Sequence, residues 1–571
     1  MWTLAKLLSV RTSALFLSVL SFAAAYAQSP VGPAEILYQH GDILTGVGLD
    51  TSAPERVQSL AVSEGRIVAT GDDQSLLRLR GPKTQVVDLH GAFVMPGFND
   101  AHTHLAEGGE EQLHVNLLGT RSLSEMLDRI AAAAKTAAPG EWLQGGGWDH
   151  TLWASQTLPT RADLDRVTAG HPAFFGRVDG HIAVANSAAL AAAHIDKNTP
   201  DVAGGKIDHD ASGEPTGILR EEPVKALVLA KIPPPIMQVR RRALELATSQ
   251  AACSGITSAQ DYSEWDDFLA MEQMERDGNL PIRISEWLTF GDPLSVLEQQ
   301  RAHHAADDPM LHTGMLKGFM DGSLGSRTAA LKAPYSDDPG NSGLPRYSQD
   351  KLNAMAIERA NAGFQLGFHA IGDRAVKMAL DAFSAALCHG DVCAADRRFR
   401  VEHSQVVSPA DFDEYRRVGV IASMQPNHLL TDMHWATERL GPERTKGSYA
   451  WKSFLDRGVV VAFGTDYPVE PIAPFRGMYS AVTRKDEAGK MEYEPQEKLT
   501  IQQAIYAYTQ GSAFAEFAEK KKGKLAPGYF ADFVVLDRDL TKIEPAAILK
   551  TQVLRTVVAG KTVCEKPAVL R

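Results

Sequence analysis

The residues best suited to chemistry in this sequence are histidines at the ends of apolar segments. His102 and His104 form a His-x-His motif that closes the apolar segment 92–98. In a β-strand the side chains at i and i+2 share a face, so both imidazoles can reach one metal ion. With 18 histidines in 571 residues such a motif also arises by chance. Its position at the end of a strand therefore carries the argument.

Further candidate ligands stand where other predicted strands end. They are Lys317, His369, His403 and Asp466. Each alone is more readily explained as a hydrogen-bonded residue of the core or rim. Together with His102 and His104 they form a nitrogen and oxygen set that suits one or two divalent ions, with zinc as the first choice. The sequence therefore predicts a metal centre.

Lys317 needs a separate explanation, because an ammonium group is an unfavourable neighbour for divalent cations. A neutral lysine that has reacted with CO2 becomes a carbamate anion, which can bridge two metal ions. The alternative is an ordinary lysine that pairs with Asp321 or reaches solvent. The spacing alone leaves both interpretations open.

The elements that must position these residues alternate short apolar segments with Ala-, Glu- and Arg-rich helical segments. This pattern favours an α/β fold with a parallel sheet, most simply a (β/α)8 TIM-like barrel. Eight strands are predicted over Phe93–His104, Ile256–Asp261, Ile282–Leu288, Met315–Phe319, Phe364–His369, Phe399–His403, Val418–Met424 and Val459–Asp466. Barrel enzymes place their chemistry at the C-terminal ends of the strands, where the candidate ligands lie.

The predicted domains follow from the spacing of the strands and from the β-prone segments near both ends of the chain. The first two barrel strands are separated by about 150 residues, far more than a βα connection needs. We therefore expect an inserted subdomain over residues 106–255 that covers the barrel mouth. Residues 28–95 and 524–571 both alternate β-prone segments with turns. They predict one small composite β-sandwich, with the barrel domain of residues 96–523 inserted between its two parts.

Residues 1–27 have the pattern of a secretory signal peptide. Lys6 and Arg11 precede the apolar segment Ala14–Leu20, and a small-x-small motif ends at Ala27. The apolar segment is too short for a stable membrane span. We therefore expect an exported protein, periplasmic or secreted, with no membrane span after the signal is removed.

Composition excludes several classes of protein. The formal net charge of −12 argues against nucleic acid as a partner. Only four cysteines occur, too few for a scaffold built on disulfides. Cys388 and Cys393 are close enough in sequence for a local bridge, and Cys253, in an apolar context, is expected to be a buried thiol.

Three longer motifs carry a family resemblance. They are Gly97–His104, Asp321–Arg327 and Phe368–Arg374, with the sequences GFNDAHTH, DGSLGSR and FHAIGDR. Together with the ordered ligand set they resemble the YtcJ-like branch, or amidohydrolase family 3, of the metal-dependent amidohydrolase superfamily. That branch includes N-substituted formamide deformylases.

The resemblance implies a (β/α)8 barrel joined to a small β-sandwich from both chain ends. It also implies that His102, His104 and Asp466 hold one metal, that His369 and His403 hold the second, and that a carboxylated Lys317 bridges them. A homodimer is an expectation at the level of the family.

The expected activity is hydrolysis of a non-peptide amide C–N bond, N-acyl, N-formyl or cyclic, in a small molecule. A metal-bound hydroxide would attack the carbonyl. Asp466 would orient this hydroxide, take its proton and pass it to the leaving nitrogen. His428 is expected either to stabilise the oxyanion or to be a rim histidine bonded to water.

Alternative functions use the same scaffold. An N-acyl amino acid deacylase would need a cation such as Arg177 or Arg327 in the cavity. A prolidase-like dipeptidase would use the same hydroxide on a dipeptide. A periplasmic binding protein built on the barrel would bind a ligand without metal or turnover.

Substrate specificity is expected in the loops and the insertion, which the resemblance places near the cavity. The candidates for substrate contact are Trp148, Asp149, Asp179, His181, Gly322 and Ser323. For Trp148, packing and substrate stacking are both consistent with the sequence.

Overall fold

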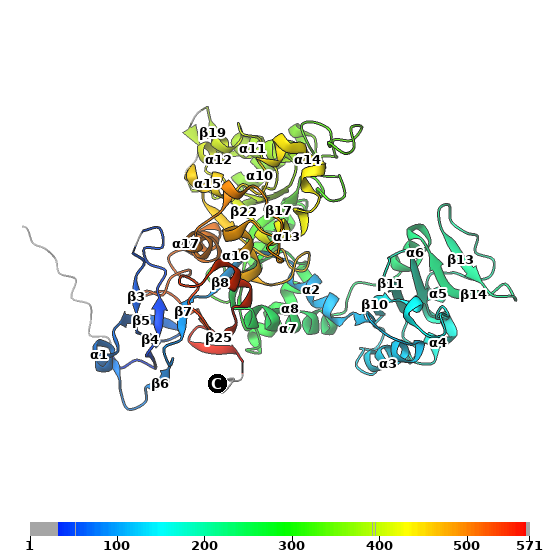
Figure 1. The fold of residues 1–571 in the computed structure, drawn as a ribbon, viewed down its shortest axis with the longest axis horizontal. Coiled ribbons are helices and arrows are strands. Elements are labelled where there is room, and N and C mark those ends of the chain that lie inside the picture. The colour runs from blue at the N-terminus through cyan, green and yellow to red at the C-terminus, as the bar shows by residue number, and fades with distance from the viewer. Residues whose placement is uncertain (1–31, 52, 391, 394–395, 567–571) are drawn as a thin grey trace, which may run out of the picture.

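A parallel eight-stranded barrel forms the centre of the computed structural model, which describes residues 32–51, 53–390, 392–393 and 396–566 (Figure 1). The predicted signal peptide lies outside these residues. The strands are β8 (Phe98–Thr103), β15 (Ile256–Asp261), β16 (Arg283–Thr289), β17 (Leu311–Phe319), β18 (Leu366–Ala370), β21 (Arg400–His403), β22 (Ile421–Met424) and β23 (Val461–Phe463). The predicted fold class is confirmed, and each of the eight predicted ranges overlaps one barrel strand, although the first also contains a strand of the small domain.

Backbone hydrogen bonds beyond the end of β23 bring the first and last strands together. Asp466 donates its N–H to the carbonyl of His102 at 2.8 Å, and His104 donates to the carbonyl of Tyr467 at 2.7 Å. Gly464 is required at this junction, because a Cβ there would lie 2.5 Å from the backbone nitrogen of His102. Two of the predicted ligand segments are therefore held side by side by the backbone itself.

Helices surround the barrel, and all of them except α18 contribute residues to its large apolar core. They are α2 (Leu105–Leu113), α7 (Met237–Cys253), α8 (Trp265–Arg276), α9 (Leu294–His303), α10 (Gln349–Asn361), α11 (Asp373–Leu387), α12 (Phe412–Val418), α13 (Pro426–Asp432), α14 (Ala436–Thr445), α15 (Trp451–Asp456), α16 (Pro474–Thr483), α17 (Ile501–Tyr506) and α18 (Ser512–Ala515). A short hairpin of β19 (Cys388–His389) and β20 (Val392–Cys393) follows α11. In the described part of the chain, no helix is both long enough and apolar enough to cross a membrane.

Two sheets built from both chain ends form the smaller domain. One has the order β5 (Arg66–Gly71), β4 (Ser59–Ser63), β1 (Ile36–Gln39), β6 (Gln85–Asp88), and the other β26 (Lys561–Glu565), β25 (Val553–Val558), β24 (Phe533–Leu536), β7 (Phe93–Pro96), β2 (Asp42–Leu44), β3 (Arg56–Val57). The helix α1 (Asp73–Leu76) follows β5. A shared apolar core joins the sheets, with the rings of Tyr38 and Phe533 at 4.9 Å in an edge-to-face contact.

The predicted strand Phe93–His104 divides into two strands of different domains. The break is at Gly97, between β7 in the small domain and β8 in the barrel. A Cβ at Gly97 would lie 2.2 Å from the side chain of Thr257, so only glycine fits where the chain passes between the domains. The apolar segment continues across this point, which is why sequence alone shows one strand.

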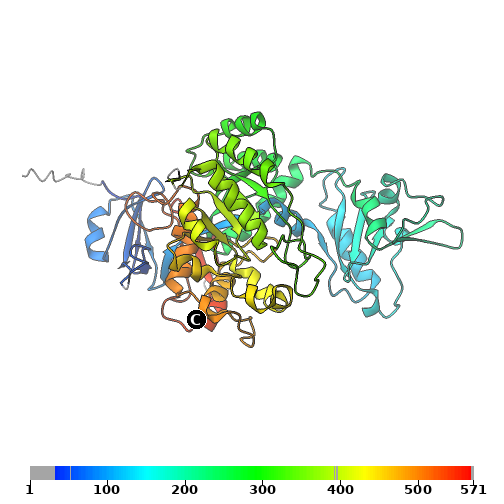
Figure 2. The ribbon, with the colours of Figure 1, turned by 90° about the horizontal axis from the view of Figure 1, so that it is seen from above.

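The insertion after the first barrel strand is a sheet with its own helices. The sheet order is β13 (Lys206–His209), β14 (Pro215–Arg220), β12 (Ile182–Ala185), β11 (Ala173–Arg177), β10 (Leu143–Trp148), β9 (Val115–Asn116), and the helices are α3 (Leu123–Ala134), α4 (Arg161–Asp165), α5 (Ser187–Ala192) and α6 (Glu222–Leu229). It projects to one side of the barrel (Figures 1 and 2). Within the predicted range 106–255, α2 and α7 pack on each other and on the barrel core.

All four cysteines form disulfides. Cys388 pairs with Cys393, and Cys253 pairs with Cys564, 311 residues further along the chain. The expectation that Cys253 is a buried thiol is therefore wrong. The partner is in the C-terminal strand β26, which packs against α7, and local sequence gives no sign of that contact.

Candidate metal centre

The predicted ligands gather at the C-terminal ends of the barrel strands. His102 lies in β8, Lys317 in β17, His369 in β18 and His403 in β21, while His104 directly follows β8 and Asp466 follows β23. His428 is on α13, after β22. Because the strands are parallel, their C-terminal ends meet at one edge of the barrel, as the sequence pattern predicts.

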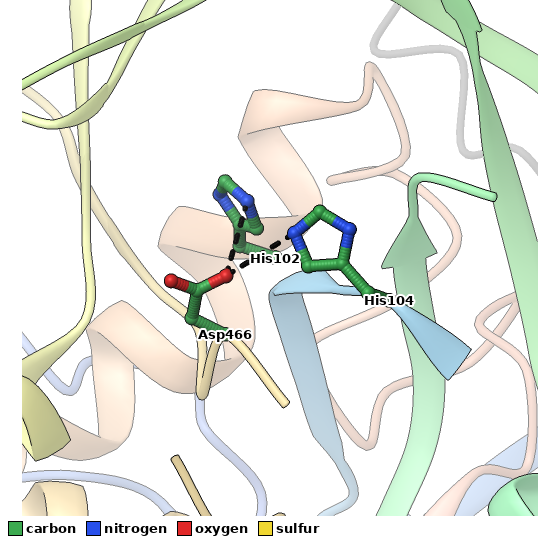
Figure 3. Close-up of side chains that lie close together, drawn as sticks. All are labelled: His102, His104 and Asp466. Atoms are coloured by element: carbon green, nitrogen blue, oxygen red, sulfur yellow. Dashed lines mark ion pairs between the residues drawn. The ribbon is translucent and has the colours of Figure 1, made fainter. Parts of the chain in front are cut away.

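One group of three ligand atoms converges on Asp466. Its Oδ1 lies 3.4 Å from His102 Nε2 and 3.3 Å from His104 Nε2 (Figure 3). His104 Nδ1 lies 3.1 Å from the carbonyl of Tyr262, so this nitrogen is the donor and Nε2 is free to accept. Two imidazole nitrogens and one carboxylate oxygen at this separation suit a zinc-type ion.

A second group uses the other oxygen of Asp466. His428 Nε2 lies 2.9 Å from Oδ2, and His403 Nδ1 lies 3.9 Å from it. The ring of His369 lies 4.4 Å from that of His403, and His369 Nε2 faces the carbonyl of Gly322 at 3.2 Å. Asp466 thus stands between two sets of histidines, an arrangement that can serve one ion or two.

Electrostatics keep the Asp466 carboxylate ionised. Burial alone would raise its pKa, but His102, His104 and His428 hold the pKa well below its usual range. The pKa of His428 is raised despite burial, because it bonds to this carboxylate. Both His403 and Asp466 have left-handed backbone conformations, with φ of 72° and 59°. Such conformations are costly for residues with a Cβ and cluster at functional sites.

Lys317 lies at the bottom of the same cluster. Its Nζ is 2.8 Å from His102 Nε2, and the residue is 1% exposed. Burial lowers the pKa of Lys317 to about 8. Asp321 is not its partner, since its carboxylate accepts backbone N–H bonds from Ala330, Ile371 and Gly372. The alternative in which Lys317 pairs with Asp321 or reaches solvent is therefore wrong.

Two buried residues of β21 support the ligands and were missed by the sequence analysis. Glu402 Oε2 lies 2.7 Å from His102 Nδ1, and Arg400 Nε donates to Glu402 Oε1 at 2.8 Å. Burial opposes ionisation, yet Arg400 and His102 lower the pKa of Glu402 to about 2. A carboxylate on the far nitrogen of a ligand histidine fixes its tautomer and orientation. The available signal was two charged residues at i and i+2 in an apolar strand.

Asp100 is a third supporting residue that sequence reasoning missed. Its carboxylate accepts from Thr465 N at 2.8 Å and Thr465 Oγ1 at 2.7 Å, and from His102 N at 3.2 Å. Burial raises its pKa to about 7. Asp100 therefore ties the strand of His102 to the loop that presents Asp466.

A cavity of about 360 Å³ opens over the cluster. Its apolar wall consists of Phe319, Leu324, Gly325, Ile371, Trp435 and Val469. Ser323 also lines the cavity, as predicted, and Gly322 contacts His369 through its carbonyl. Among the described residues that line it, Lys317 is the only lysine or arginine.

The predicted substrate contacts from the insertion do not reach this cavity. Trp148 is fully buried in the core of the insertion, with Nε1 donating to the carbonyl of Phe175 at 2.9 Å. Asp149 and Asp179 both pair with Arg177, and His181 pairs with Glu221 at 2.9 Å. No described residue of the projecting sheet lines the cavity.

The expected cover over the barrel mouth is therefore wrong in this structure (Figure 2). An insertion that has its own two-sided core buries its aromatic residues internally. The sequence shows that these residues are aromatic, but not whether they pack in the core of the insertion or line the barrel cavity.

Comparisons with known proteins show which proteins this chain resembles. The profile of the amidohydrolase family matches residues 85–564. The chain is 34% identical to YtcJ of Bacillus subtilis over 521 residues, 90% of this chain and 97% of that protein. It is 28% identical to the N-substituted formamide deformylase of Arthrobacter pascens over 519 residues, 88% of this chain and 94% of that protein.

A solved structure is also similar along most of its length. The crystal structure of an uncharacterized metal-dependent hydrolase from Pyrococcus furiosus aligns with a TM-score of 0.73 at 31% identity. The alignment covers 89% of this chain and 100% of that one.

Proposed function

The chain belongs to the amidohydrolase family of metal-dependent hydrolases, and from this premise we propose that it cleaves a non-peptide amide C–N bond in a neutral small molecule. The observation that carries the proposal is the convergence of His102, His104, His403 and His428 on the two oxygens of Asp466. This convergence lies at the floor of a cavity with an apolar wall.

The residues present fit a divalent metal. His102, His104 and Asp466 would hold one ion. His369 and His403, whose ring centroids lie 4.4 Å apart, would hold a second, with zinc favoured by the imidazole-rich set. When bound, the ion acts as a Lewis acid that lowers the pKa of a coordinated water and polarises a carbonyl. The supporting bonds from Glu402 and from the carbonyl of Tyr262 assign the N–H of His102 and His104 to Nδ1, so Nε2 of each carries the lone pair that coordination needs.

Asp466 is the proposed proton carrier. Its low pKa keeps the carboxylate ionised at neutral pH, so Oδ2 can accept a proton from the attacking water. That proton must then reach the amide nitrogen, because an amide anion is a poor leaving group. His428 holds Oδ2 at 2.9 Å, and we assign it to orienting Asp466. To stabilise the oxyanion, as the sequence predicts, His428 would have to give up its bond to Asp466 and donate to the substrate oxygen instead.

Lys317 is proposed to carry a carbamate. Its low pKa makes the neutral amine accessible, and attack of Nζ on CO2 forms an N–C bond and releases one proton to solvent. The product is an anion in place of a cation beside His102. Carbon-13 NMR of protein equilibrated with labelled CO2 should show a carbamate signal that Lys317→Arg lacks. A spectrum without that signal, in enzyme that is fully active, would contradict this assignment.

The cavity supports a neutral substrate over an acidic one. An N-acyl amino acid deacylase or a dipeptidase needs a cation for the substrate carboxylate. Arg327 instead pairs with Asp337 at 2.8 Å, and Arg177 lies on the projecting insertion. Cleavage of N-substituted formamides, the reaction named for the Arthrobacter relative, is the first choice. The complete ligand set disfavours the binding-protein alternative.

Metal analysis together with a substrate panel tests this function. We expect bound metal in the purified protein and turnover of neutral N-substituted formamides or amides, with N-acetyl amino acids hydrolysed more slowly. His102→Ala should lose metal and activity, whereas His90→Ala, an exposed histidine of the small domain, should retain both. Full activity in metal-free protein, or a preference for the acidic substrates, would overturn the proposal.

Export is proposed from two observations. Residues 1–27 have the signal-peptide pattern, and all four cysteines are paired, which is typical of oxidising compartments. Sequencing the N-terminus of the protein recovered outside the cytoplasm should show cleavage after Ala27. An uncleaved protein that remains in the cytoplasm would contradict this prediction.

A further inference from the structure

A second cluster of potential ligands lies at the opposite end of the barrel from the mouth. It consists of Glu275 near the end of α8, His304 directly after α9, and Asp308 in the loop that leads into β17. Helices α8 and α9 each follow a barrel strand, so their C-terminal ends lie at the N-terminal ends of the strands. Residues at this face of such barrels serve stability, whereas catalysis occurs at the other face.

The geometry of this cluster centres on the imidazole of His304. Its Nε2 lies 3.7 Å from Glu275 Oε2 and 3.7 Å from Asp308 Oδ2. Both separations are too long for hydrogen bonds. The Nε2 atom is also buried, with no hydrogen-bond partner among the described residues. A buried polar atom without a partner is costly, and here it points between two carboxylates.

The other ring nitrogen of His304, Nδ1, is already held in place. His304 Nδ1 lies 3.1 Å from Glu272 Oε1, and Arg276 binds the second oxygen of Glu272 at 2.8 Å. The ring edge packs on Phe268, with ring centroids 5.7 Å apart. With Nδ1 as donor to Glu272, the lone pair of Nε2 is free to accept. A carboxylate bonded to the outer nitrogen of a histidine is the usual second shell of a metal ligand.

The two acidic side chains also favour a cation between them and His304. The Glu275 and Asp308 carboxyl groups lie close together, and both face His304 Nε2. A proton shared between the two carboxyl groups would relieve their repulsion but would leave His304 Nε2 unpaired. A divalent cation between the three atoms satisfies all of them at once.

We propose that Glu275, His304 and Asp308 bind a structural divalent cation of the zinc class, separate from the centre at the barrel mouth. Two ligand atoms 3.7 Å apart, each about 2.1 Å from an ion, subtend about 120° at it, close to the geometry of three protein ligands plus water. The side chains of His304, Glu275 and Asp308 are 14%, 21% and 25% exposed, so an ion can enter and keep a water. Imidazole with two carboxylates favours zinc or manganese over calcium.

The bound ion would tie the end of α8 to the loop before β17. Because β17 carries Lys317 at its other end, this link holds the strand in position without taking part in the reaction. The site therefore predicts a metal effect on folding stability that is independent of the metal effect on turnover.

Zinc content and thermal unfolding of the holoenzyme test this site. We compare the wild type with His304→Ala, with Glu275→Gln and with His209→Ala, an exposed histidine of the insertion that lies outside this cluster. In zinc-buffered solution the wild type and His209→Ala should hold one more zinc per chain than His304→Ala. Added zinc should raise the unfolding temperature of the first two only, while turnover stays the same in all folded variants.

The variants are chosen so that each result decides the question. Circular dichroism establishes folding, and Glu275→Gln replaces His304→Ala if the latter does not fold. Glu272→Gln, which keeps all three ligands, should weaken zinc binding at this site about 10- to 100-fold. Equal zinc content in the wild type and a folded ligand variant would overturn the proposal. So would a loss shared by His209→Ala, since that loss would not depend on the ligands.

Discussion

Replacing Glu402 by glutamine tests whether this buried carboxylate supports metal binding by His102, because zinc affinity and folding stability can be measured separately. Glu402 is fully buried, lies 2.7 Å from His102 Nδ1, and accepts a hydrogen bond from Arg400 at 2.8 Å. Its pKa of about 2 means that the side chain is a carboxylate at neutral pH. Glutamine keeps the volume but replaces one acceptor oxygen by an NH2 donor, and it removes the charge that orients and polarises His102.

Two magnitudes follow from this environment. Loss of a carboxylate behind a ligand histidine lowers metal affinity about 10- to 100-fold, or about 1.4–2.7 kcal/mol. Breaking a buried ion pair costs about 3–5 kcal/mol of folding stability. Arg400 keeps its bonds to the carbonyl of Ala101 at 2.7 Å and to Ser423 Oγ at 2.8 Å, so we expect about 3 kcal/mol.

Zinc affinity is measured by competition with a chromogenic chelator, and stability by urea unfolding of the metal-free protein. Glu286→Gln is the matched control, because Glu286 is a glutamate that is 1% exposed on another strand of the same barrel, β16. Burial and Asp261 raise the pKa of Glu286 well above its ordinary value, in contrast to that of Glu402. The control should leave zinc affinity unchanged. Wild-type affinity in Glu402→Gln, or an equal loss in the control, would refute the reasoning.

Three further predictions concern acid, reduction and the aromatic residues. The ionised Glu402 stabilises the fold at neutral pH, and this contribution of about 3 kcal/mol is lost as the pH falls from 4.5 toward about 2. The free energy of unfolding, measured as a function of pH, should therefore lack this decrease in Glu402→Gln. Replacing Cys253 and Cys564 by serine should lower stability by about 5 kcal/mol in urea unfolding, against about 2 kcal/mol for removal of the local disulfide, because the loop closed is far longer. Trp148→Ala should destabilise the insertion by about 3–5 kcal/mol with KM unchanged, whereas Trp435→Ala should raise KM about tenfold with little change in stability. Equal KM values in the two tryptophan variants would contradict the assignment of the cavity wall.

The barrel could be predicted because its signal is local. Each strand is a short apolar segment followed by a helical one, and a ligand candidate at its end must lie at the C-terminal edge of a parallel sheet. Lys317, His369 and Asp466 were placed at that edge in this way, and the structure brings them to one cavity. Whether they bind metal stays a prediction.

The supporting residues could not be assigned roles from sequence. Glu402 and Asp100 are ordinary acidic residues until the fold places Glu402 against His102 and Asp100 against Thr465. Their function depends on contacts between segments that are some 300 residues apart for Glu402 and His102. No local pattern encodes such contacts.

The sequence by itself determined the order of the elements and the chemical types of the ligands, since periodicity and strand ends depend only on near neighbours along the chain. The tertiary structure alone decided which core buries Trp148, which cysteine pairs with Cys253, and which oxygen of Asp466 each histidine faces. These outcomes depend on long-range packing, where one side chain has many chemically acceptable partners. Only the closed barrel and the docked insertion select among them.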